Sequence, residues 1–460
     1  MLLIAALAQT ALPAETICAA RFVRMFYEQR HDALAWFDGD RLRPDALALI
    51  DAIDASREDG LAPSDYHANG IRELLPSAAA HQRELDVLLT DGFLLLASHL
   101  LAGRVDPESI EPTWCLEPRS TDVVALLDAA LENHDVREVL RQLSPNRPGY
   151  HRLREELSRL RAIESRGGWP AVSRRAPREE LLARLDLASD ATDKQLREAV
   201  RHFQRLHGSR DDGVAGPRTL RELNVPIGDR IRQVELNMER WRWLPSDFGQ
   251  RYVVINIPEF HLRLIDNGRE ILSMRVVVGK EYRRTPIFST TITQVIFSPY
   301  WNVPDSIADD ELWPTAARDS GFLQREHMEI VADGRLRQKP GPWNSLGGIK
   351  FNMPNRYNVY LHDTPSRSLF EETVRTFSHG CIRIQQPVEL ALYLLRDDAR
   401  WTREQVLAYA ARGVECAVDV KEPLPVHVLY WTAFVGDDDE LHFAPDVYNR
   451  DPILDRAMRR

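Results

Sequence analysis

The residues whose types and spacing suit chemistry lie in one short stretch toward the C-terminal end of the chain. His362 ends the run 357–362, and Cys381 closes the tetrapeptide Ser-His-Gly-Cys, which also contains His379. A cysteine attacks as the thiolate, and a neighbouring imidazole lowers the pKa of the thiol or takes its proton. A strand, a loop and a second strand would bring these groups together. The stretch indicates nucleophilic catalysis, whereas a lone cysteine would more simply be a buried core thiol.

The loop around Cys381 suits acyl transfer. Gly380 lets the backbone approach a substrate closely. The amides of His379, Gly380 and Cys381 could point at a developing oxyanion. Ser378 could form a hydrogen bond within the site or simply end the loop. The loop therefore supplies candidates for both the nucleophile and the pocket that surrounds it.

Strand alternation adds two further candidates. In the run 357–362, Tyr360 and His362 share one face with the two-residue period of a half-buried strand, so Tyr360 could line the pocket. Arg383 lies in the apolar run after the thiol and shares a face with Cys381. There it could pair with a substrate carboxylate or stabilise the fold.

The whole pattern is more specific than its parts. His362, a polar loop and then Ser378-His379-Gly380-Cys381 before an Ile-Arg-Ile strand form a pattern that resembles the catalytic signature of the L,D-transpeptidases, the YkuD-type cysteine enzymes of bacterial cell walls. The resemblance implies that Cys381 attacks the carbonyl of the third residue of a peptidoglycan stem peptide and expels the terminal D-alanine. An amine on a second stem then takes the thioester, which gives an L,D cross-link.

The same resemblance implies roles and partners. His362 would accept and donate the proton and His379 would shape the pocket, although two imidazoles in one site leave the base open between them. The implied partners are a tetrapeptide donor stem, an amine acceptor, an anchored lipoprotein as a further acceptor, and carbapenem-type inhibitors. The implied location is the periplasm or cell envelope of a bacterium. No cofactor and no metal are expected.

Other functions stay open. If water replaces the amine, the same thioester makes an L,D-carboxypeptidase or an endopeptidase that acts on the same stems, because the choice of acceptor depends on what is excluded from the site. A protein of a different class would bind the cell wall without catalysis, but binding alone needs no thiolate site. A papain-like protease fits poorly, because its cysteine would stand near the mature N-terminus with the histidine far downstream.

The elements that must position these residues form a β-rich domain. From Arg251 the hydrophobic period changes from helical to two, and a helix over 228–244 precedes it. A helical and then loop-like pattern from about 308 to 347 interrupts the strands, which predicts a cap that gates the site or a surface insertion without gating. The predicted strands are 252–257, 261–265, 271–278 and 287–297, with Asp266-Asn267-Gly268 marking a hairpin.

Two helical regions come before the β-rich domain. In the first, apolar residues recur at three- and four-residue steps, as in an amphipathic helix, and the apolar run 88–101 is interrupted by charge and reads as a buried core helix. In the second, Thr192 and Gln195 have the spacing of a capping box ahead of an apolar stripe. The string FQRLHG…DGVAGPRTLRELN in this second region resembles the peptidoglycan-binding module of wall enzymes.

Composition bounds the remaining possibilities. A chain of 460 residues holds about three domains at roughly 150 residues each. A net charge of -10 gives no basic surface for nucleic acid, and four widely separated cysteines indicate neither a disulfide framework nor a zinc site. The apolar segment 1–14 would suit a weak or truncated signal peptide or the first turns of a helix. We therefore predict a multi-domain α+β protein with a helical scaffold domain (15–170), a small three-helix peptidoglycan-binding-like module (171–227) and a β-rich YkuD-type catalytic domain (228–451) with an inserted cap at about 308–347.

Overall fold

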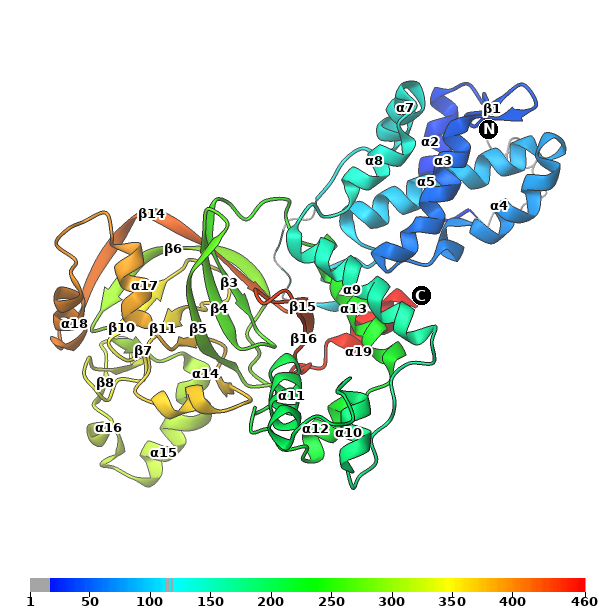
Figure 1. Cartoon of the computed structure of the whole chain (residues 1–460). Coiled ribbons are helices and arrows are strands. Elements are labelled where there is room, and N and C mark those ends of the chain that lie inside the picture. Colours follow the sequence, from blue (N-terminus) through cyan, green and yellow to red (C-terminus); the bar gives the residue numbers. More distant parts are fainter. Residues whose placement is uncertain (1–16, 113, 115, 117–118, 460) are drawn as a thin grey trace.

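The computed structural model describes residues 17–112, 114, 116 and 119–459. Along the chain it shows a helical bundle, a small helical module and a domain built on a large β-sheet (Figure 1). The bundle stands at one end of the molecule, and the module lies beside the sheet domain. The multi-domain α+β class predicted from the sequence is confirmed. The apolar segment 1–14, for which a signal peptide or a first helical turn was expected, lies outside the described residues.

One long helix organises the N-terminal bundle. This helix, α5 (Gln82–Ala102), has a mean hydropathy of 1.6 over its most apolar window, but 72% of that window is buried inside the protein. It is thus the core helix that the apolar run 88–101 predicted. The other elements of the bundle are α2 (Ala20–Gln29), β1 (Phe37–Asp38), β2 (Arg41–Leu42), α3 (Pro44–Ala55), η2 (Ser56–Asp59), η3 (Pro63–Tyr66), α4 (Ala68–Leu74), η4 (Leu75–Ala80), α7 (Val123–Asn133) and α8 (Val136–Leu143). The next helices, α6 (Pro107–Ile110) and α9 (Pro148–Glu164), pack instead on the core of the sheet domain.

The small module is formed by α10 (Arg178–Arg184), α11 (Asp193–Leu206) and α12 (Pro217–Leu223). Its predicted capping box is present: the Thr192 hydroxyl accepts from the amide of Gln195, whose side chain accepts from the amide of Thr192. The buried side chain of Gln204 bonds four groups in the connecting segment and in α12, and so fixes this connection. The module's small apolar core consists of Val172, Leu181, Phe203 and Leu223.

The large domain is built on a mixed sheet. Its strands are β3 (Arg251–Asn256), β4 (His261–Asp266), β5 (Arg269–Gly279), β6 (Phe288–Phe297), β10 (Ile349–Asn352), β11 (Leu361–His362), β12 (Thr376–Ser378), β13 (Ile382–Ile384) and β14 (Cys416–Leu429). The order is β12-β5-β13-β11-β10-β6-β14-β3-β4, and β4 also pairs with β5, so the sheet curls back on itself. The predicted hairpin joins β4 to β5, because Asn267 and Gly268 adopt the left-handed φ angles of 49° and 74° that a two-residue turn requires.

Helix α13 (Ile227–Arg242) joins the bundle to the sheet domain. Its Arg242 and Glu239 form a fully buried ion pair, and Arg242 also donates to the hydroxyl of Tyr150 in α9. A charge removed from water needs such partners, so the pair fixes how the two domains meet. The remaining elements of the sheet domain are η6 (Arg367–Glu371), α17 (Pro387–Leu394), α18 (Arg403–Ala411), β15 (Ala433–Val435), β16 (Leu441–Phe443) and α19 (Asp451–Met458).

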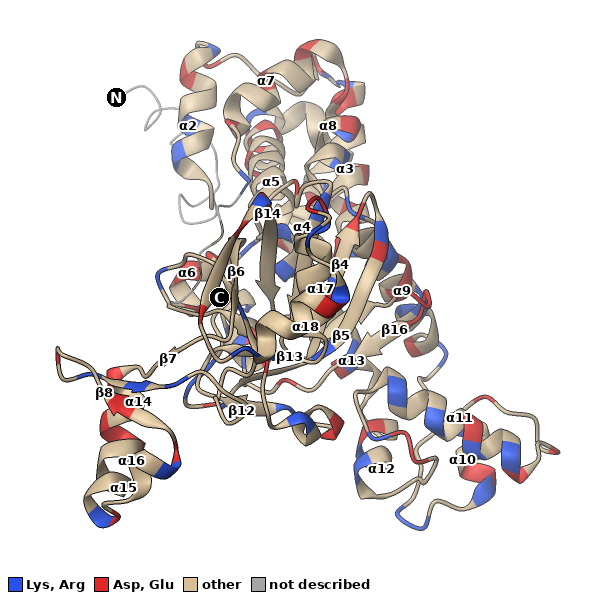
Figure 2. Ribbon diagram, turned by 90° about the vertical axis from the view of Figure 1, so that its left-hand side faces the viewer, with Lys and Arg blue, Asp and Glu red and all other residues tan. Residues whose placement is uncertain are grey.

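A separate subdomain, the cap (301–338), interrupts the sheet between β6 and β10. It projects away from the sheet domain at the lower left of Figure 2 and has its own small apolar core. It begins at Trp301 rather than near 308, because its first strand pairs with its last and closes the unit on itself. Its elements are β7 (Trp301–Asn302), α14 (Asp305–Ile307), η5 (Ala308–Leu312), α15 (Trp313–Arg318), α16 (Phe322–Arg325), β8 (Met328–Ile330) and β9 (Leu336–Gln338).

The strand predicted over 357–362 is shorter than expected. Only Leu361–His362 forms a strand, β11. The Asn355 carboxamide accepts from two main-chain amides of the preceding turn, and Asn358 has a left-handed φ of 53°. A left-handed residue interrupts the two-residue period. The expected alternation of faces therefore does not extend back through Asn358.

Candidate active site

Two neighbouring strands bring the predicted residues together. Strands β11 and β13 run parallel, with Leu361 opposite Ile382 and His362 opposite Arg383. Cys381 directly precedes β13, so the thiol and the His362 imidazole reach the same cavity of about 400 Å³. The predicted residues that line this cavity are Tyr360, His362, Ser378, His379, Cys381 and Arg383. Gly380 is buried within the turn that carries the thiol.

The turn 378–381 is braced from within. The Ser378 hydroxyl accepts a hydrogen bond from the Gly380 amide at 3.1 Å and donates to the Cys381 carbonyl. Thr285 donates to the Gly380 carbonyl at 2.8 Å. Gly380 adopts a φ of 115°, which side chains rarely allow. The Gly380 amide is thus already bonded, so of the three amides expected to face an oxyanion only those of His379 and Cys381 remain candidates.

The Cys381 sulfur is half-buried at the wall of the cavity. It lies 3.8 Å from the main-chain oxygen of Asn358, and both the amide and the hydroxyl of Tyr360 donate to it. Burial raises the pKa of the thiol, whereas the hydrogen bonds from Tyr360 and the charges of Lys350 and Arg383 oppose that rise. The donors of Tyr360 and the two cations therefore favour the thiolate, whereas burial and the contact with the Asn358 carbonyl favour the thiol.

His362 is buried and neutral. Its Nδ1 lies 2.5 Å from the Asp363 carbonyl, so this nitrogen carries the hydrogen, and the backbone at Leu346 makes a second contact with the ring. Burial and the nearby charge of Arg383 lower the pKa of His362 to about 3, although both backbone contacts favour the imidazolium. An imidazole that is neutral at physiological pH is able to accept a proton.

His379 turns toward the cap. Its Nε2 lies 2.6 Å from a carboxylate oxygen of Glu311 in η5. The preceding cap residue, Asp310, pairs with Arg283 at 2.5 Å. The alternation expected between residues 379 and 381 is broken by the positive φ of the intervening glycine. Asp310 and Glu311, which are adjacent in the cap, thus both form ion pairs at the rim of the cavity, and Glu311 is the one that contacts His379.

Sequence reasoning missed Lys350. This residue of β10 pairs with His362 across the ladder, and its Nζ lies 4.0 Å from the centre of the Tyr360 ring. Burial lowers the pKa of Lys350, while the nearby thiolate form of Cys381 raises it. A usable signal was present, because Lys350 lies between the buried residues Ile349 and Phe351 and so must project to the opposite face.

Arg383 lines the cavity with an unsatisfied donor. Its Nε is buried and has no hydrogen-bond partner among the described residues. Burial lowers the pKa of the guanidinium, which still remains charged at physiological pH. A buried, unpaired donor of this kind has a free-energy cost that an anionic ligand would relieve. The geometry thus agrees with the substrate-binding alternative predicted for Arg383.

Family models match consecutive segments of the chain. Residues 250–408 match the model of the L,D-transpeptidase catalytic domain, YkuD. The β-rich domain is thus similar to YkuD catalytic domains. Residues 21–157 match the model of the scaffold domain, and residues 179–223 match a "Putative peptidoglycan binding domain". The resemblance drawn from the His362 and Ser-His-Gly-Cys pattern is therefore confirmed, and the pattern lies inside the YkuD match.

Relatives of the YkuD protein family cover part of this chain. A curated "Putative L,D-transpeptidase" from Haemophilus influenzae is 30% identical over 259 residues, which are 52% of this chain and 51% of that protein, so the chain spans about half of that relative. An L,D-transpeptidase structure from Mycobacterium smegmatis has 16% identity and a TM-score of 0.22, and covers 39% of this chain and 58% of that one. The L,D-transpeptidase 3 of Mycobacterium tuberculosis was solved with a faropenem-derived adduct. It has 17% identity and a TM-score of 0.21, and the match covers 39% of this chain and 60% of that one. Structural likenesses at this level carry no inference about this chain.

The YkuD domain thus presents a compact set of groups. It holds a half-buried thiol, hydrogen-bond donors at the sulfur, two nearby cations and a neutral imidazole around one cavity. Cations and donors stabilise negative charge on sulfur, and a neutral imidazole accepts a proton. This arrangement suits attack by a thiolate on a carbonyl carbon, in a cavity that the cap partly covers.

Proposed function

We propose that this chain is a peptidoglycan L,D-transpeptidase that joins stem peptides through a cysteine thioester. The observation that carries the proposal is the environment of the Cys381 sulfur, which takes two hydrogen bonds from Tyr360 and lies near the cations of Lys350 and Arg383. The match of residues 250–408 to the YkuD model supports the same class of reaction. A structural cysteine would need neither these donors nor these charges.

The reaction has two acyl transfers. The Cys381 sulfur attacks the carbonyl carbon of the third residue of a donor tetrapeptide, the carbon–nitrogen bond to the terminal D-alanine breaks, and D-alanine leaves with a proton on its amine. The amine of a second stem then attacks the thioester and loses a proton, and the sulfur departs as the thiolate. No oxidant or reductant enters, and the thiol is regenerated.

His362 serves as the base. Its depressed pKa of about 3 keeps the ring neutral before the reaction, and the backbone acceptors at Asp363 and Leu346 stabilise the imidazolium once it has taken the thiol proton. His379 acts indirectly, because its Nε2 is bonded to Glu311. We therefore assign the proton transfer to His362 and an electrostatic and shaping role to His379.

The remaining predicted residues position the substrate. The amides of His379 and Cys381 stabilise the oxyanion, while Ser378 and Gly380 hold the turn that presents them. Arg383, whose buried Nε lacks a protein partner among the described residues, binds a carboxylate of the donor stem. The site thereby binds the donor stem both at its reacting carbonyl and at a carboxylate.

The cap selects the acceptor. It reaches the cavity rim through Glu311 and Asp310, and its Trp301 donates to the hydroxyl of Tyr360 beside the thiol. A cap that excludes water favours the amine over hydrolysis. The natural substrate places the protein in the periplasm or cell envelope, and a carbapenem would acylate the same thiol.

A single incubation tests the proposal. The full chain is mixed with purified disaccharide-tetrapeptide, and the products are separated and weighed by mass spectrometry. Transpeptidation gives a dimer that has lost one D-alanine, whereas an L,D-carboxypeptidase gives a trimmed monomer and an endopeptidase cleaves preformed cross-links. Unchanged substrate under all conditions would contradict catalysis and leave a wall-binding protein.

A further inference from the structure

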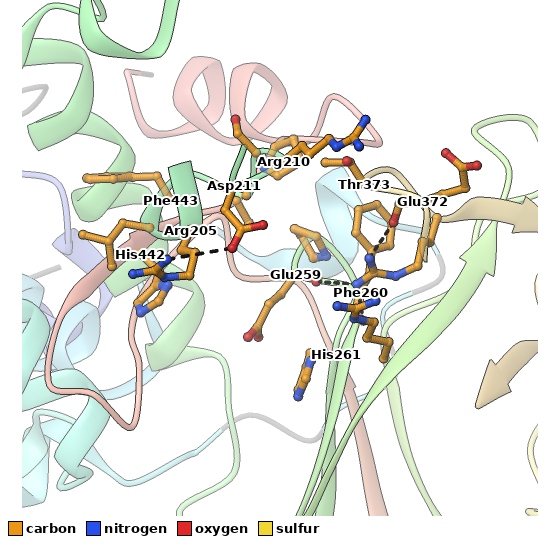
Figure 3. A pocket seen from close by; sticks show the side chains of 18 of the residues that line it. Arg205, Arg210, Asp211, Glu259, Phe260, His261, Glu372, Thr373, His442 and Phe443 are labelled. Atoms are coloured by element: carbon orange, nitrogen blue, oxygen red, sulfur yellow. Dashed lines mark hydrogen bonds and ion pairs between the residues drawn. The ribbon is translucent and has the colours of Figure 1, made fainter. Parts of the chain in front are cut away.

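A second and larger cavity lies between the helical module and the sheet domain. Its volume is about 840 Å³, against about 400 Å³ for the cavity at Cys381, and small-molecule sites occupy about 300–1,000 Å³. Its walls come from the end of α11 and the residues after it, the β3–β4 turn, the segment 371–375 before β12, and the β15–β16 hairpin. Figure 3 shows side chains from these separate segments around one space. None of the residues placed at the thiol lines it.

The module contacts the C-terminal hairpin beside the cavity. His202 of the module lies 3.0 Å from the Glu440 carboxylate, and the His207 ring packs on Phe443 with centroids 5.4 Å apart. A side chain at Gly208 would meet the Pro445 ring at 3.1 Å, which shows how closely the backbones approach. The module and the hairpin are therefore in direct contact beside the cavity.

The rim carries exposed charges of both signs. Arg210 on the module and Glu372 on the sheet domain are exposed and form no salt bridge within the part of the chain that the structure describes. Arg205 and Asp211 lie 3.8 Å apart, beyond hydrogen-bond distance. Figure 3 shows Arg210 and Glu372 on different walls of the cavity. A ligand that bridges the walls would meet a cation on one side and an anion on the other.

The floor adds hydrogen-bonding groups and a buried cation, Arg375, that is bonded to main-chain carbonyls. The buried Arg375 guanidinium donates to the carbonyls of Val276 and Phe260 at 3.1 and 3.0 Å and to that of Glu372 at 2.7 Å. The Arg275 guanidinium is paired with Glu371 at 2.8 Å. The exposed charges that a ligand can reach directly are those of the rim, Arg210 and Glu372.

We infer that this cavity binds a zwitterionic peptide, a peptidoglycan stem, at a site separate from the thiol; the identity of the peptide rests on the proposed function. A stem carries free carboxylates and, at its diamino acid, a free amine, which match Arg210 and Glu372 respectively. A polyanion such as a nucleic acid is disfavoured, because carboxylates face the arginines around the lining. An apolar ligand would leave the charged rim without partners.

The site lies close in the chain to the reacting turn. The segment 371–375 that walls the cavity continues directly into β12 and then into the turn 378–381. A stem held there anchors a peptidoglycan strand on the sheet domain and the module together. The module therefore contributes one wall of a composite site rather than a complete groove of its own.

Binding to a full-length chain that carries Cys381→Ala tests the inference, because this variant cannot turn the ligand over. Disaccharide-tetrapeptide is titrated by calorimetry. We expect Arg210→Glu and Glu372→Lys each to weaken the second binding event about tenfold, through loss of one charge-assisted hydrogen bond and new repulsion. The matched controls Arg221→Glu and Glu179→Lys reverse exposed charges of the module away from the cavity and should leave both binding events unchanged.

The two proposals fail separately. Arg383→Ala should weaken only the event at the thiol cavity, whereas Arg210→Glu should weaken only the event between the domains. Binding that is indifferent to both Arg210→Glu and Glu372→Lys overturns the second site and leaves the transpeptidase proposal intact. Binding that responds to these changes in a wild-type chain without turnover keeps the second site and overturns the proposed reaction. Melting temperatures show that each variant folds.

Discussion

The catalytic turn and the cap border the same cavity, but different interactions hold them. The turn 378–381 is fixed by buried hydrogen bonds: Ser378 bonds two main-chain groups, Thr285 holds the Gly380 carbonyl, and strands β12 and β13 continue into the sheet on either side. Buried hydrogen bonds are costly to break, because each freed group loses its partner without gaining water. The proposed nucleophile, Cys381, is therefore held in a well-bonded turn.

The cap is held at its rim by exposed ion pairs. Glu311 contacts His379, and Asp310 contacts Arg283, with carboxylates that are about half exposed. Such pairs contribute only about 0–1 kcal/mol each, and salt screens them. This fold thus separates a well-fixed thiol from an entrance whose contacts are weak.

The largest effect is expected at the nucleophile. Cys381→Ala should lower the rate of dimer formation by about 10⁴-fold or more, because the covalent intermediate no longer forms. The melting temperature should change little, since the thiol is half-buried beside an open cavity. The matched control is Cys416→Ala, which removes another half-buried free thiol and should keep full activity. Residual turnover in the first variant would exclude a thioester mechanism.

An acid-sensitive contribution to stability is expected from His362. The unfolded chain binds a proton at this ring below about pH 6.5, whereas the folded chain does so only near pH 3. The free energy of unfolding should therefore fall as the pH drops through this window, by up to about 5 kcal/mol from this group. His362→Gln should flatten the curve measured by urea unfolding between pH 7 and pH 4. Parallel curves for the two proteins would contradict the buried neutral imidazole.

The hydroxyl of Ser378 should matter for both fold and rate. Ser378→Ala leaves the Gly380 amide and the Cys381 carbonyl without their partner, which should cost about 1–3 kcal/mol and lower activity at least tenfold. Ser306→Ala removes an exposed hydroxyl on the cap side of the same cavity and should change neither quantity. Equal effects for both serines would remove the distinction between a rigid turn and a loose cap.

A smaller effect is expected from the phenol beside the sulfur. Tyr360→Phe removes one donor to Cys381, so the pKa of the thiol should rise and its alkylation by iodoacetamide should shift to higher pH. Activity at neutral pH should fall about threefold to tenfold. The measurement requires a chain in which the other cysteines are alanine. Tyr357→Phe is the matched control, because its hydroxyl accepts from Arg356 in the same cavity wall.

The smallest effect on stability is expected in the cap. Glu311→Gln weakens the contact with His379, and the free energy of unfolding should change by less than about 1 kcal/mol. The ratio of dimer to trimmed monomer should nevertheless move toward hydrolysis as the cap opens. Asp333→Asn, which breaks an ion pair with Arg335 in the outer hairpin of the cap, should leave the ratio unchanged. Identical ratios in both variants would show that the cap does not gate.

Local features of the fold were predictable from the sequence because they depend on neighbouring residues. The Asn267-Gly268 hairpin and the Thr192–Gln195 capping box each follow from a few adjacent side chains. The shortened strand before His362 shows the limit of this approach, because Asn358 interrupts a pattern that otherwise suits a strand. Hydrophobic periodicity and residue propensity predict where a helix or strand forms, but a single residue with a left-handed φ, such as Asn358, shortens the strand.

The sequence alone pointed to the proposed nucleophile, its two histidines and the likeness to the YkuD domain, because these lie in one short stretch whose order is itself the signal. Only the tertiary structure decided that Lys350 lies near the thiol and over the Tyr360 ring, and that His379 contacts Glu311 of the cap. It also decided that the module and the sheet domain enclose a second cavity. These facts depend on strand order and domain docking. Both bring together residues far apart in the chain, and no local spacing encodes such contacts.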